Sequence, residues 1–296
     1  MEYVIETKAL MKRYGTKAAV NNMSLHVKKG DIYGLIGKNG AGKTTLMKLL
    51  LGITAPNSGE IKLFGGEELG AARRKIGSLV ETPALYQNET ALENLKRFAI
   101  LAPTSDEEIK RLLAFVGLAN TGAKKAGEFS LGMRQRLGLA IALLGNPEML
   151  ILDEPINGLD PAGIKEVRDV ILEMNAKGVT FLISSHLLDE LGKIATSYGI
   201  MADGVLVEEL TASELEERSR TSVKLIVNDP ALAVAALTNC HPNIQIDQSG
   251  QILRILSPVE DVSLIVEELV QSRVRIYQVI SESQGVEDYF IERMGK

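Results

Sequence analysis

The spacing of hydrophobic positions changes along the chain. From Tyr3 to Lys62, short β-branched stretches such as "EYVIETKALMKRYG" and "GEIKLFG" are separated by Gly, Asn and Lys turns, which predicts a strand-rich start. One helix, "TTLMKLLLG", is expected to interrupt these strands and to end at Gly52. Residues 90–145 have helical spacing instead, with helix caps expected at Thr90 and Ser105. We interpret this second region as a helical insertion.

Two apolar runs follow the insertion. They are "MLILD" and "VTFLIS", and the helical segment "AGIKEVRDVILEMNAKG" separates them. Continuous apolar runs joined through a helix are typical of parallel strands that are buried on both faces. Residues 1–211 are therefore predicted to form an α/β domain, with a helical subdomain at about 82–147.

A second domain is predicted after residue 211. The segment "TASELEERSR" is expected to be a charged helix with a capping box of Thr211 and Glu214, and residues 212–221 are expected to serve as a linker. Residues 222–296 are expected to form a small α+β domain in the order β-α-β-β-α-β, a ferredoxin-like arrangement, followed by a closing helix "GVEDYFIERM". Such a domain would bind a regulatory ligand, brace a dimer or cap the core. No polar cluster in it decides between these roles, and we prefer the dimer brace.

The segment "GLIGKNGAGKTT" follows an apolar strand and carries the first candidate chemistry. Its spacing matches the phosphate-binding pattern G-x-x-x-x-G-K-[ST]. The loop amides and the start of the next helix would attract phosphate oxygens, with Lys43 reaching the β- and γ-phosphates and Thr44 binding Mg²⁺. The alternative is a Gly-rich turn without function. The residues expected to bind nucleotide here are Gly37, Asn39, Gly40, Ala41, Gly42, Lys43, Thr44 and Thr45.

Two further strand ends carry reactive side chains. Open parallel sheets bind ligands beyond the carboxyl ends of their strands, so these side chains are expected to meet the phosphate loop. Asp153 and Glu154 follow "MLIL", where Asp153 is expected to hold Mg²⁺ through water and Glu154 to polarise the attacking water as general base. His186 ends "VTFLISSH" and is expected to bind the γ-phosphate. Solvated turn carboxylates and a structural histidine are the alternatives.

Composition and charge narrow the class of protein. The 296 residues, of which 45% are hydrophobic, are enough for one large and one small domain. A formal net charge of −5 argues against a nucleic-acid partner. The start "MEYVIETKAL" lacks the regions of a signal peptide, no apolar run reaches about 18 residues, and a single cysteine fits a reducing compartment. A cytoplasmic location is therefore expected.

The motifs "GKNGAGKT", "FSLGMRQR", "MLILDEPINGLDP" and "SSH", in this order, resemble the ATP-binding subunit of an ABC transporter. In that family they correspond to the Walker A, signature, Walker B with D-loop, and H-switch motifs. The resemblance covers residues 1 to about 211 and implies a P-loop NTPase core with an antiparallel β subdomain and a helical insertion. It also implies ATP hydrolysis, with ATP and Mg²⁺ bound. The "FSLGM" form, "GSLVETPALYQNETALENL" and the "EDYF" ending resemble the bacitracin-resistance and lantibiotic-immunity branch.

The resemblance also implies partners. ATPase subunits of this family work as head-to-tail pairs around two ATP molecules, so it implies a homodimer or a pair with a homologous subunit. Integral membrane permease chains would carry the pair at the inner face of the cell membrane, with export of a peptide or lipid-linked antimicrobial as the task. Ser130 and Gly132 would contact the γ-phosphate held by the other subunit, and Tyr14 would stack on adenine. The alternatives are an ordinary helix cap for Ser130 and a core position for Tyr14.

Two positions depart from the family pattern. Leu131 and Met133 replace the first Gly and the Gln of the usual Leu-Ser-Gly-Gly-Gln signature. Glu81 stands where most members have a Gln near Mg²⁺, and its charge would bind a hard cation more strongly. The rival functions are a soluble ABC-type ATPase switch in translation or DNA repair, and a different phosphate-loop NTPase. A second cassette, a long coiled-coil insertion and a guanine motif would favour these rivals, and the sequence contains none of them.

Overall fold

The computed structural model describes residues 2–218, 222–242, 244–255, 261–282, 289–290 and 293. The chain divides into two compact units, Met1–Ala212 together with Arg293–Lys296, and Ser213–Glu292. The division falls between Ala212 and Ser213, inside the helix α8 (Ala212–Arg218). Among the described residues, the first unit contains two sheets and the second contains one.

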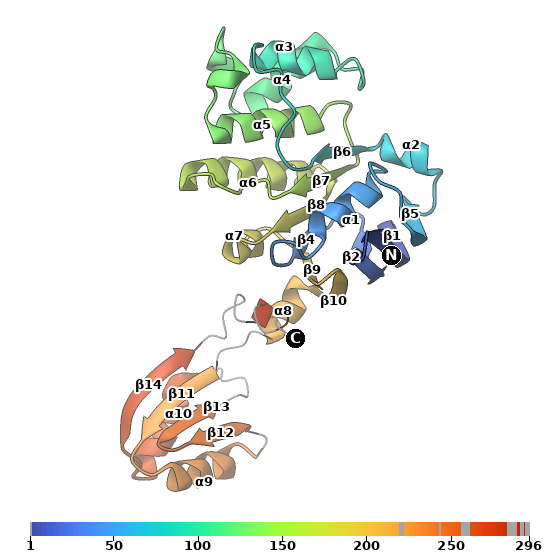
Figure 1. Ribbon diagram of the computed structural model, residues 1–296. Helices are drawn as coiled ribbons and strands as arrows, with labels where there is room; N and C mark the ends of the chain where they lie inside the picture. The colour runs from blue at the N-terminus through green and yellow to red at the C-terminus, as the bar shows by residue number, and fades with distance from the viewer. Residues whose placement is uncertain are drawn as a thin grey trace. The chain divides into compact units, whose positions relative to one another are not determined.

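A six-stranded sheet forms the centre of the first unit, in the order β10-β9-β4-β8-β7-β6 (Figure 1). Its strands are β4 (Ile32–Ile36), β6 (Ile76–Leu79), β7 (Met149–Asp153), β8 (Thr180–Ser185), β9 (Ser197–Ala202) and β10 (Val205–Thr211). All neighbouring strands are parallel except β10, which pairs antiparallel with β9. β4, β7 and β8 are buried along their whole length, which explains their continuous apolar sequences.

A smaller antiparallel sheet packs against the other side of the first helix. Its strands are β1 (Tyr3–Tyr14), β2 (Lys17–Met23), β3 (His26–Lys28) and β5 (Ser58–Leu63), and β1 pairs with each of the others. The helix α1 (Lys43–Leu50) buries Leu46 and Met47 in one hydrophobic cluster with residues of both sheets. Gly52 follows with a φ of 74°, as a glycine at a helix end commonly does. The expected strand-rich start and its single helix up to Gly52 are confirmed.

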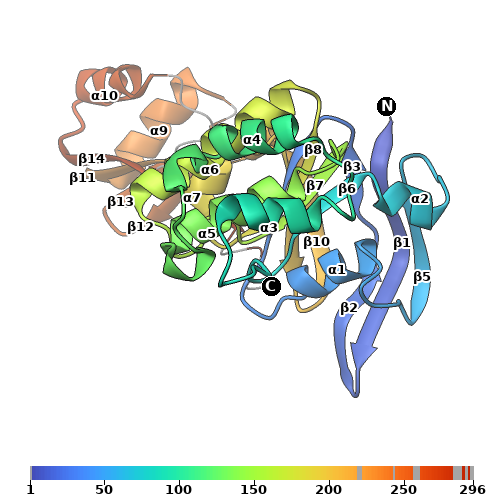
Figure 2. The same ribbon diagram turned by 90° about the horizontal axis from the view of Figure 1, so that it is seen from above.

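Three helices form the expected insertion and gather at one end of the unit (Figure 1). They are α3 (Ala91–Phe98), α4 (Asp106–Phe115) and α5 (Leu131–Ala142), and the 3₁₀ turns η1 (Ala119–Thr121) and η2 (Ala126–Glu128) lie between α4 and α5. Thr90 and Ser105 cap the first two helices through their side chains, as predicted. The unit also contains α2 (Leu69–Arg73), α6 (Pro161–Ala176) and α7 (Leu188–Gly192). α6 and α1 lie on opposite faces of the six-stranded sheet (Figure 2).

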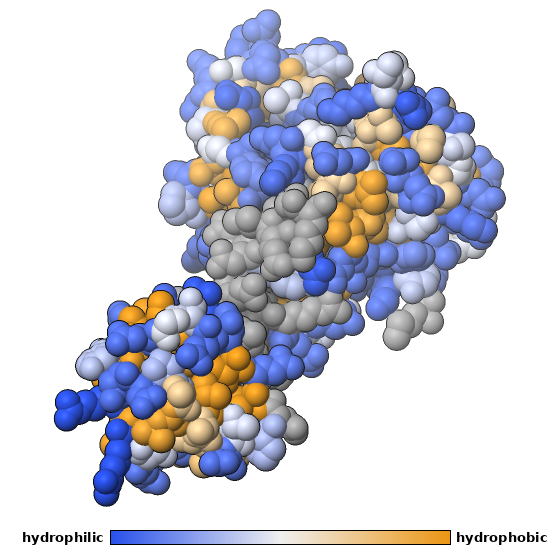
Figure 3. Space-filling model, turned by 60° about the horizontal axis from the view of Figure 1, so that its bottom comes forward, coloured by the Kyte–Doolittle hydropathy of each residue, from blue (hydrophilic) through white to orange (hydrophobic). Residues whose placement is uncertain are grey.

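The second unit has the predicted order of elements. These are β11 (Ser222–Val227), α9 (Pro230–Cys240), β12 (Ile246–Ser249), β13 (Ile252–Ile255), α10 (Val262–Gln271) and β14 (Ile276–Glu282). The strands form an antiparallel sheet in the order β12-β13-β11-β14, which is the ferredoxin-like arrangement. Leu237 of α9 and Leu269 of α10 are fully buried in one cluster with Leu225 of the sheet. Apolar side chains also remain on the face of this unit that Figure 3 displays, among charged ones.

Part of the predicted domain plan stays a prediction. Of the expected closing helix, Tyr289, Phe290 and Arg293 are described, and its other residues lie outside the described part. Segment 212–221 is helical as far as Arg218. Its role as a linker and the domain limits at 211 and 222 remain our proposals.

Candidate functional site

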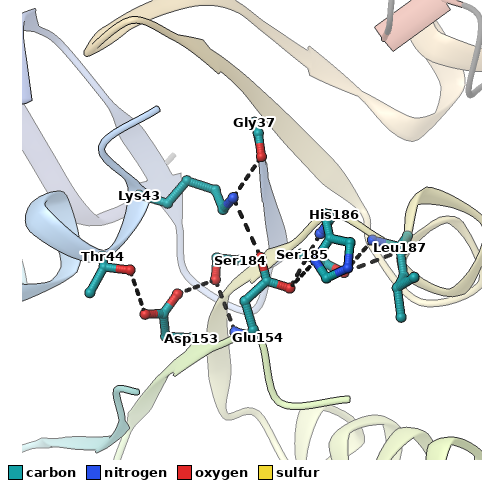
Figure 4. Close-up of polar contacts among 9 residues, drawn as sticks. All are labelled: Gly37, Lys43, Thr44, Asp153, Glu154, Ser184, Ser185, His186 and Leu187. Atoms are coloured by element: carbon teal, nitrogen blue, oxygen red, sulfur yellow. Dashed lines mark hydrogen bonds and ion pairs between the residues drawn. The ribbon is translucent and has the colours of Figure 1, made fainter. Parts of the chain in front are cut away.

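The carboxyl ends of β4, β7 and β8 bring the expected catalytic side chains together (Figure 4). β8 lies between β4 and β7, and all three strands run in the same direction. The phosphate loop follows β4, Glu154 follows β7, and His186 follows β8. Sheet topology therefore places residues far apart in sequence at one edge, as expected for an open α/β sheet.

Close backbone packing requires glycine in the phosphate loop. A Cβ added to Gly42, whose φ is 107°, would lie 2.1 Å from the carbonyl oxygen of Ala19. A Cβ added to Gly37 would lie 2.5 Å from the carbonyl oxygen of Met201. The tip of the loop, including Asn39 and Gly40, is exposed, and α1 begins immediately after Gly42. The loop is thus held tightly at its base and open at its tip, with helical amides directed at the opening.

Lys43 is buried among oxygen atoms of the chain itself. Its side chain is 6% exposed, and its Nζ donates a hydrogen bond of 2.6 Å to the carbonyl oxygen of Gly37. The same Nζ lies 3.4 Å from Oε1 of Glu154 (Figure 4). Burying an ammonium group is costly unless it is paired, and these two oxygens provide the pairing.

Asp153 is held through both of its carboxylate oxygens. The hydroxyl of Thr44 donates to Oδ2 at 2.7 Å, and the hydroxyl of Ser184 donates to Oδ1 at 2.5 Å. Ser184 also accepts a hydrogen bond of 3.0 Å from the backbone N–H of Glu154. Sequence reasoning missed Ser184, although a hydroxyl near the carboxyl end of an apolar strand, two residues before His186, was a usable signal.

Glu154 lies between a lysine and a histidine. Its Oε2 is 2.8 Å from Nδ1 of His186, and its Oε1 faces Lys43. Oε1 is buried and makes no hydrogen bond within the described residues. The backbone of Glu154 has a φ of 51°, a left-handed conformation that is uncommon for residues other than glycine and that often occurs at functional sites. A buried carboxylate oxygen without a hydrogen-bond donor is available to bind one.

Glu81 pairs with a lysine that sequence reasoning did not single out. Nζ of Lys48 donates a hydrogen bond of 2.6 Å to Oε1 of Glu81. This hydrogen bond raises the pKa of Lys48 above its usual range. Lys48 lies four residues after Thr44 on α1, and that spacing places both side chains on one face of the helix. The spacing was the signal that could have identified Lys48.

Three expected binding residues lie outside this cluster of contacts. Tyr14 is 53% exposed at the end of β1, with Nζ of Lys12 5.2 Å from its ring centroid, so it is not a core residue. Ser130 caps α5 by accepting a hydrogen bond of 3.3 Å from the backbone N–H of Met133, and Gly132 lies in the first turn. In the described part of the chain, neither Ser130 nor Gly132 hydrogen-bonds to the phosphate loop.

The oxygen ligands fit a metal ion that arrives with a phosphate ligand. Among the described residues, no group of three or more His, Cys, Asp or Glu side chains is arranged to hold a metal by itself. Mg²⁺ usually takes one or two protein oxygens and completes its shell with phosphates and water. Thr44 and Asp153 offer hard oxygen ligands of this kind, beside the phosphate loop.

Comparison with known proteins identifies the family. Residues 20–157 match the family described as "ABC transporter". The bacitracin transport ATP-binding protein BcrA of Enterococcus faecalis is 41% identical over 300 residues, which cover 100% of this chain and 97% of that protein. The lantibiotic transport ATP-binding protein SrtF of Streptococcus pyogenes is 44% identical over 217 residues, which cover 72% of this chain and 95% of that protein.

A solved structure agrees with these relatives. A dimeric bacterial ABC transporter cassette is 26% identical and has a TM-score of 0.64, covering 70% of this chain and 98% of its own. The resemblance inferred from the motifs, including that to the bacitracin and lantibiotic branch, is confirmed. No helix in the described part of the chain has the length and apolar character needed to cross a membrane. The chain belongs to the ATP-binding proteins of ABC transporters and is an ATP-binding, ATP-hydrolysing subunit of that family.

Proposed function

We propose that this chain is the motor subunit of an exporter for an antimicrobial of the bacitracin or lantibiotic class. Two subunits would pair around two ATP molecules and drive a separate integral membrane permease. The full-length similarity to a bacitracin transport protein and the shorter similarity to a lantibiotic transport protein support this substrate class. The observation that carries the mechanism is the Glu154 carboxylate, which lies between His186 and the phosphate-loop residue Lys43.

Lys43 and Thr44 would bind the phosphates and their metal ion. In the proposed bound state, the γ-phosphate replaces Glu154 as the partner of the Lys43 ammonium. Thr44 and Asp153 would hold Mg²⁺, and Glu81 is the further candidate ligand. When bound, the ion would neutralise the charge that develops on the phosphate oxygens. The ring of Tyr14, exposed at the strand end, would stack on adenine.

Glu154 would orient and polarise the attacking water. Its buried Oε1 makes no hydrogen bond within the described residues, so it is an available acceptor for a water proton. His186, 2.8 Å from the other carboxylate oxygen, would keep Glu154 in place and steady the γ-phosphate. Fixed charges aimed at the reacting phosphate are the main source of catalysis in phosphoryl transfer.

The signature residues would complete the site of a second subunit. Ser130 and Gly132 start α5, and the N-terminus of a helix attracts phosphate. They do not hydrogen-bond to the loop of their own chain within the described residues, which is consistent with action on a partner's nucleotide. The dimeric cassette of similar fold supports this pairing, either as a homodimer or with a homologous subunit.

The permease would dock near the segment from Glu81 to Asn94. Asn94 is buried and organises this segment, because its Oδ1 accepts from the backbone N–H of Tyr86 at 2.8 Å and its Nδ2 donates to the carbonyl oxygen of Thr90 at 2.9 Å. The Tyr86 ring is exposed, with the Arg97 guanidinium 4.9 Å from its centroid. An exposed aromatic beside an arginine is typical of interface anchors. Docking there would hold the chain at the inner face of the cell membrane, without a nucleic-acid partner.

Copurification tests the partner. Tagged Glu154→Gln protein is expressed, membranes are solubilised with ATP present, and the captured proteins are identified; Lys43→Ala, which should not retain ATP, is the matched control. We expect a stoichiometric multi-spanning protein with Glu154→Gln and less of it with Lys43→Ala. Capture of ribosomes or DNA without a membrane protein would instead favour the soluble switch. Coexpression with the captured permease should raise resistance to bacitracin or a lantibiotic, and Glu154→Gln should remove that resistance.

A further inference from the structure

The ion pair between Lys48 and Glu81 joins the phosphate-loop helix to the segment that leads into the helical insertion. Lys48 is on α1, and Glu81 lies between β6 and α3. The two side chains are 30% and 61% exposed, and Nζ and Oε1 are 2.6 Å apart. Glu81 has a φ of 63°, in the left-handed region that favours glycine. A strained conformation of this kind persists only when its surroundings hold it.

Lys48 lies on the face of α1 that also carries Thr44, the candidate metal ligand. The hydroxyl of Thr44 bonds to Asp153, and, after the hydrogen bond and the charge of Glu81, the negative charge of Asp153 also raises the pKa of Lys48. Lys48 is therefore a cation within range of the metal-binding carboxylate as well as of Glu81. The mechanism proposed above uses neither Lys48 nor its pairing with Glu81.

We propose that Lys48 is a positioning residue that holds the Glu81 carboxylate and offsets its charge until the metal–nucleotide complex binds. The inference rests on the proposed function of the phosphate loop. A neutral amide at position 81 would need no counter-charge, whereas a carboxylate there adds a negative charge beside a polyphosphate. Lys48 supplies the compensating charge, and on binding Glu81 exchanges Lys48 for the metal ion.

The ion pair between Lys48 and Glu81 is weak enough for a bound metal ion to replace Lys48. Partly exposed ion pairs contribute little to stability, because water and salt screen them. A divalent cation attracts a carboxylate more strongly than an ammonium does, so it competes effectively for Glu81. The two side chains thus form a small two-state element whose equilibrium the bound ligand shifts.

Nucleotide binding with and without metal tests the proposal. The probe is ATP with an N-methylanthraniloyl fluorophore, titrated into the full chain in excess EDTA and then in excess Mg²⁺. The proteins are the unchanged chain, Lys48→Met, Glu81→Gln, the double variant and Lys48→Arg. The quantity compared is the ratio of Kd in EDTA to Kd in Mg²⁺, which measures how much binding gains from the metal.

We expect opposite shifts in the two single variants. Lys48→Met leaves Glu81 uncompensated, so it should weaken metal-free binding and raise the ratio about threefold to tenfold. Glu81→Gln removes a metal ligand and also removes the negative charge beside the polyphosphate, so metal-free binding should improve and the ratio should fall. The double variant should have the same ratio as Glu81→Gln alone, because Lys48 then has no carboxylate to compensate. Lys48→Arg should resemble the unchanged chain.

A control separates this effect from a general loss of positive charge. Lys96 and Asp106 form a similar exposed ion pair in the helical insertion, 2.8 Å apart, with side chains 46% and 68% exposed. Lys96→Met should leave the ratio unchanged. The proposal would be overturned if Lys48→Met changed the Kd ratio equally in the unchanged chain and in the Glu81→Gln variant. Lys48 would then act on the phosphates directly. No effect of Lys48→Met would also overturn it. Loss of all nucleotide binding in the unchanged chain would overturn the proposed function itself, and with it this inference.

Discussion

Each unit contains a histidine beside a glutamate, in nearly the same geometry. Nδ1 of His186 lies 2.8 Å from Oε2 of Glu154, with the two side chains 39% and 21% exposed. Nε2 of His241 lies 2.9 Å from Oε2 of Glu268, with the two side chains 43% and 27% exposed. Distance and burial alone therefore do not separate a candidate catalytic pair from a structural one.

The surroundings of the two pairs differ. The first pair lies where β7 and β8 end, and Glu154 also faces the buried Lys43 of the phosphate loop. In the second pair, His241 is the residue that ends α9 and Glu268 belongs to α10. That contact ties two helices of one small domain together. The neighbouring charges and backbone amides, not the pair itself, make the first pair the candidate catalytic one.

The largest expected effect is the difference between two single variants, in which the glutamate of one pair or of the other is changed to Gln. Glu154→Gln should reduce steady-state phosphate release about 10²- to 10⁴-fold, the usual contribution of a general base, while ATP still binds. Glu268→Gln should change it less than about twofold, since that carboxylate lies in the other unit. A Glu154→Gln protein with normal turnover would remove Glu154 from the mechanism.

Core truncation tests whether the two units are independent. Leu237→Ala in the second unit empties a fully buried position and should cost about 2–5 kcal/mol of that unit's stability. The ATPase rate should stay within about twofold, because the site lies wholly in the first unit. Leu46→Ala in α1 is the matched change in the first unit, and it should lower both stability and nucleotide affinity. Circular dichroism during urea unfolding measures the stability. A parallel loss of ATPase activity in Leu237→Ala would show that the units are coupled.

Ser184 tests the support behind the carboxylates. Ser184→Ala removes the hydroxyl that donates to Asp153 and accepts from the backbone of Glu154. A hydrogen bond to a charged group is worth about 1.5–3 kcal/mol, so we expect a roughly tenfold or larger fall in phosphate release. The control is Ser185→Ala, whose hydroxyl bonds only near Leu187 in the described structure. Equal effects of the two changes would indicate a general disturbance of β8.

The smallest expected effect is a pH dependence that differs between units. Oδ1 of Asp261 accepts hydrogen bonds from the backbone and hydroxyl of Ser263 at the start of α10, and these lower the pKa of Asp261 below its usual 3.8. A carboxylate with a lowered folded-state pKa stabilises the protein above its unfolded-state pKa, and this contribution disappears as pH falls through the folded-state value. The melting temperature of the second unit should therefore fall less steeply with decreasing pH, below about pH 5, in Asp261→Asn than in the unchanged chain.

The matched position in the first unit is Glu93. Its carboxylate accepts from the backbone and hydroxyl of Thr90 in a capping box, and this lowers the pKa of Glu93 as well. In Glu93→Gln, the melting temperature of the first unit should fall less steeply at acid pH, and that of the second unit should be unchanged. If either change altered the melting of both units equally, the separate treatment of the units would be wrong.

Most of the fold could be predicted from local signals in the sequence. Apolar runs, capping residues and the glycine spacing of the phosphate loop act within a few residues of each other, so they are readable from sequence. The order of elements in both units followed from them, as did the choice of Lys43, Asp153, Glu154 and His186. Both compact units, by contrast, become separate bodies only through long-range packing.

By itself, the sequence determined which chemical groups the protein has and at which strand ends they occur. Only the tertiary structure decided which of them touch: Ser184 with Asp153, Lys43 with Glu154, and Lys48 with Glu81. It also separated two histidine–glutamate pairs that look alike in isolation. The physical reason is that strand order and helix packing set contacts between residues far apart in sequence, and no local pattern specifies those contacts.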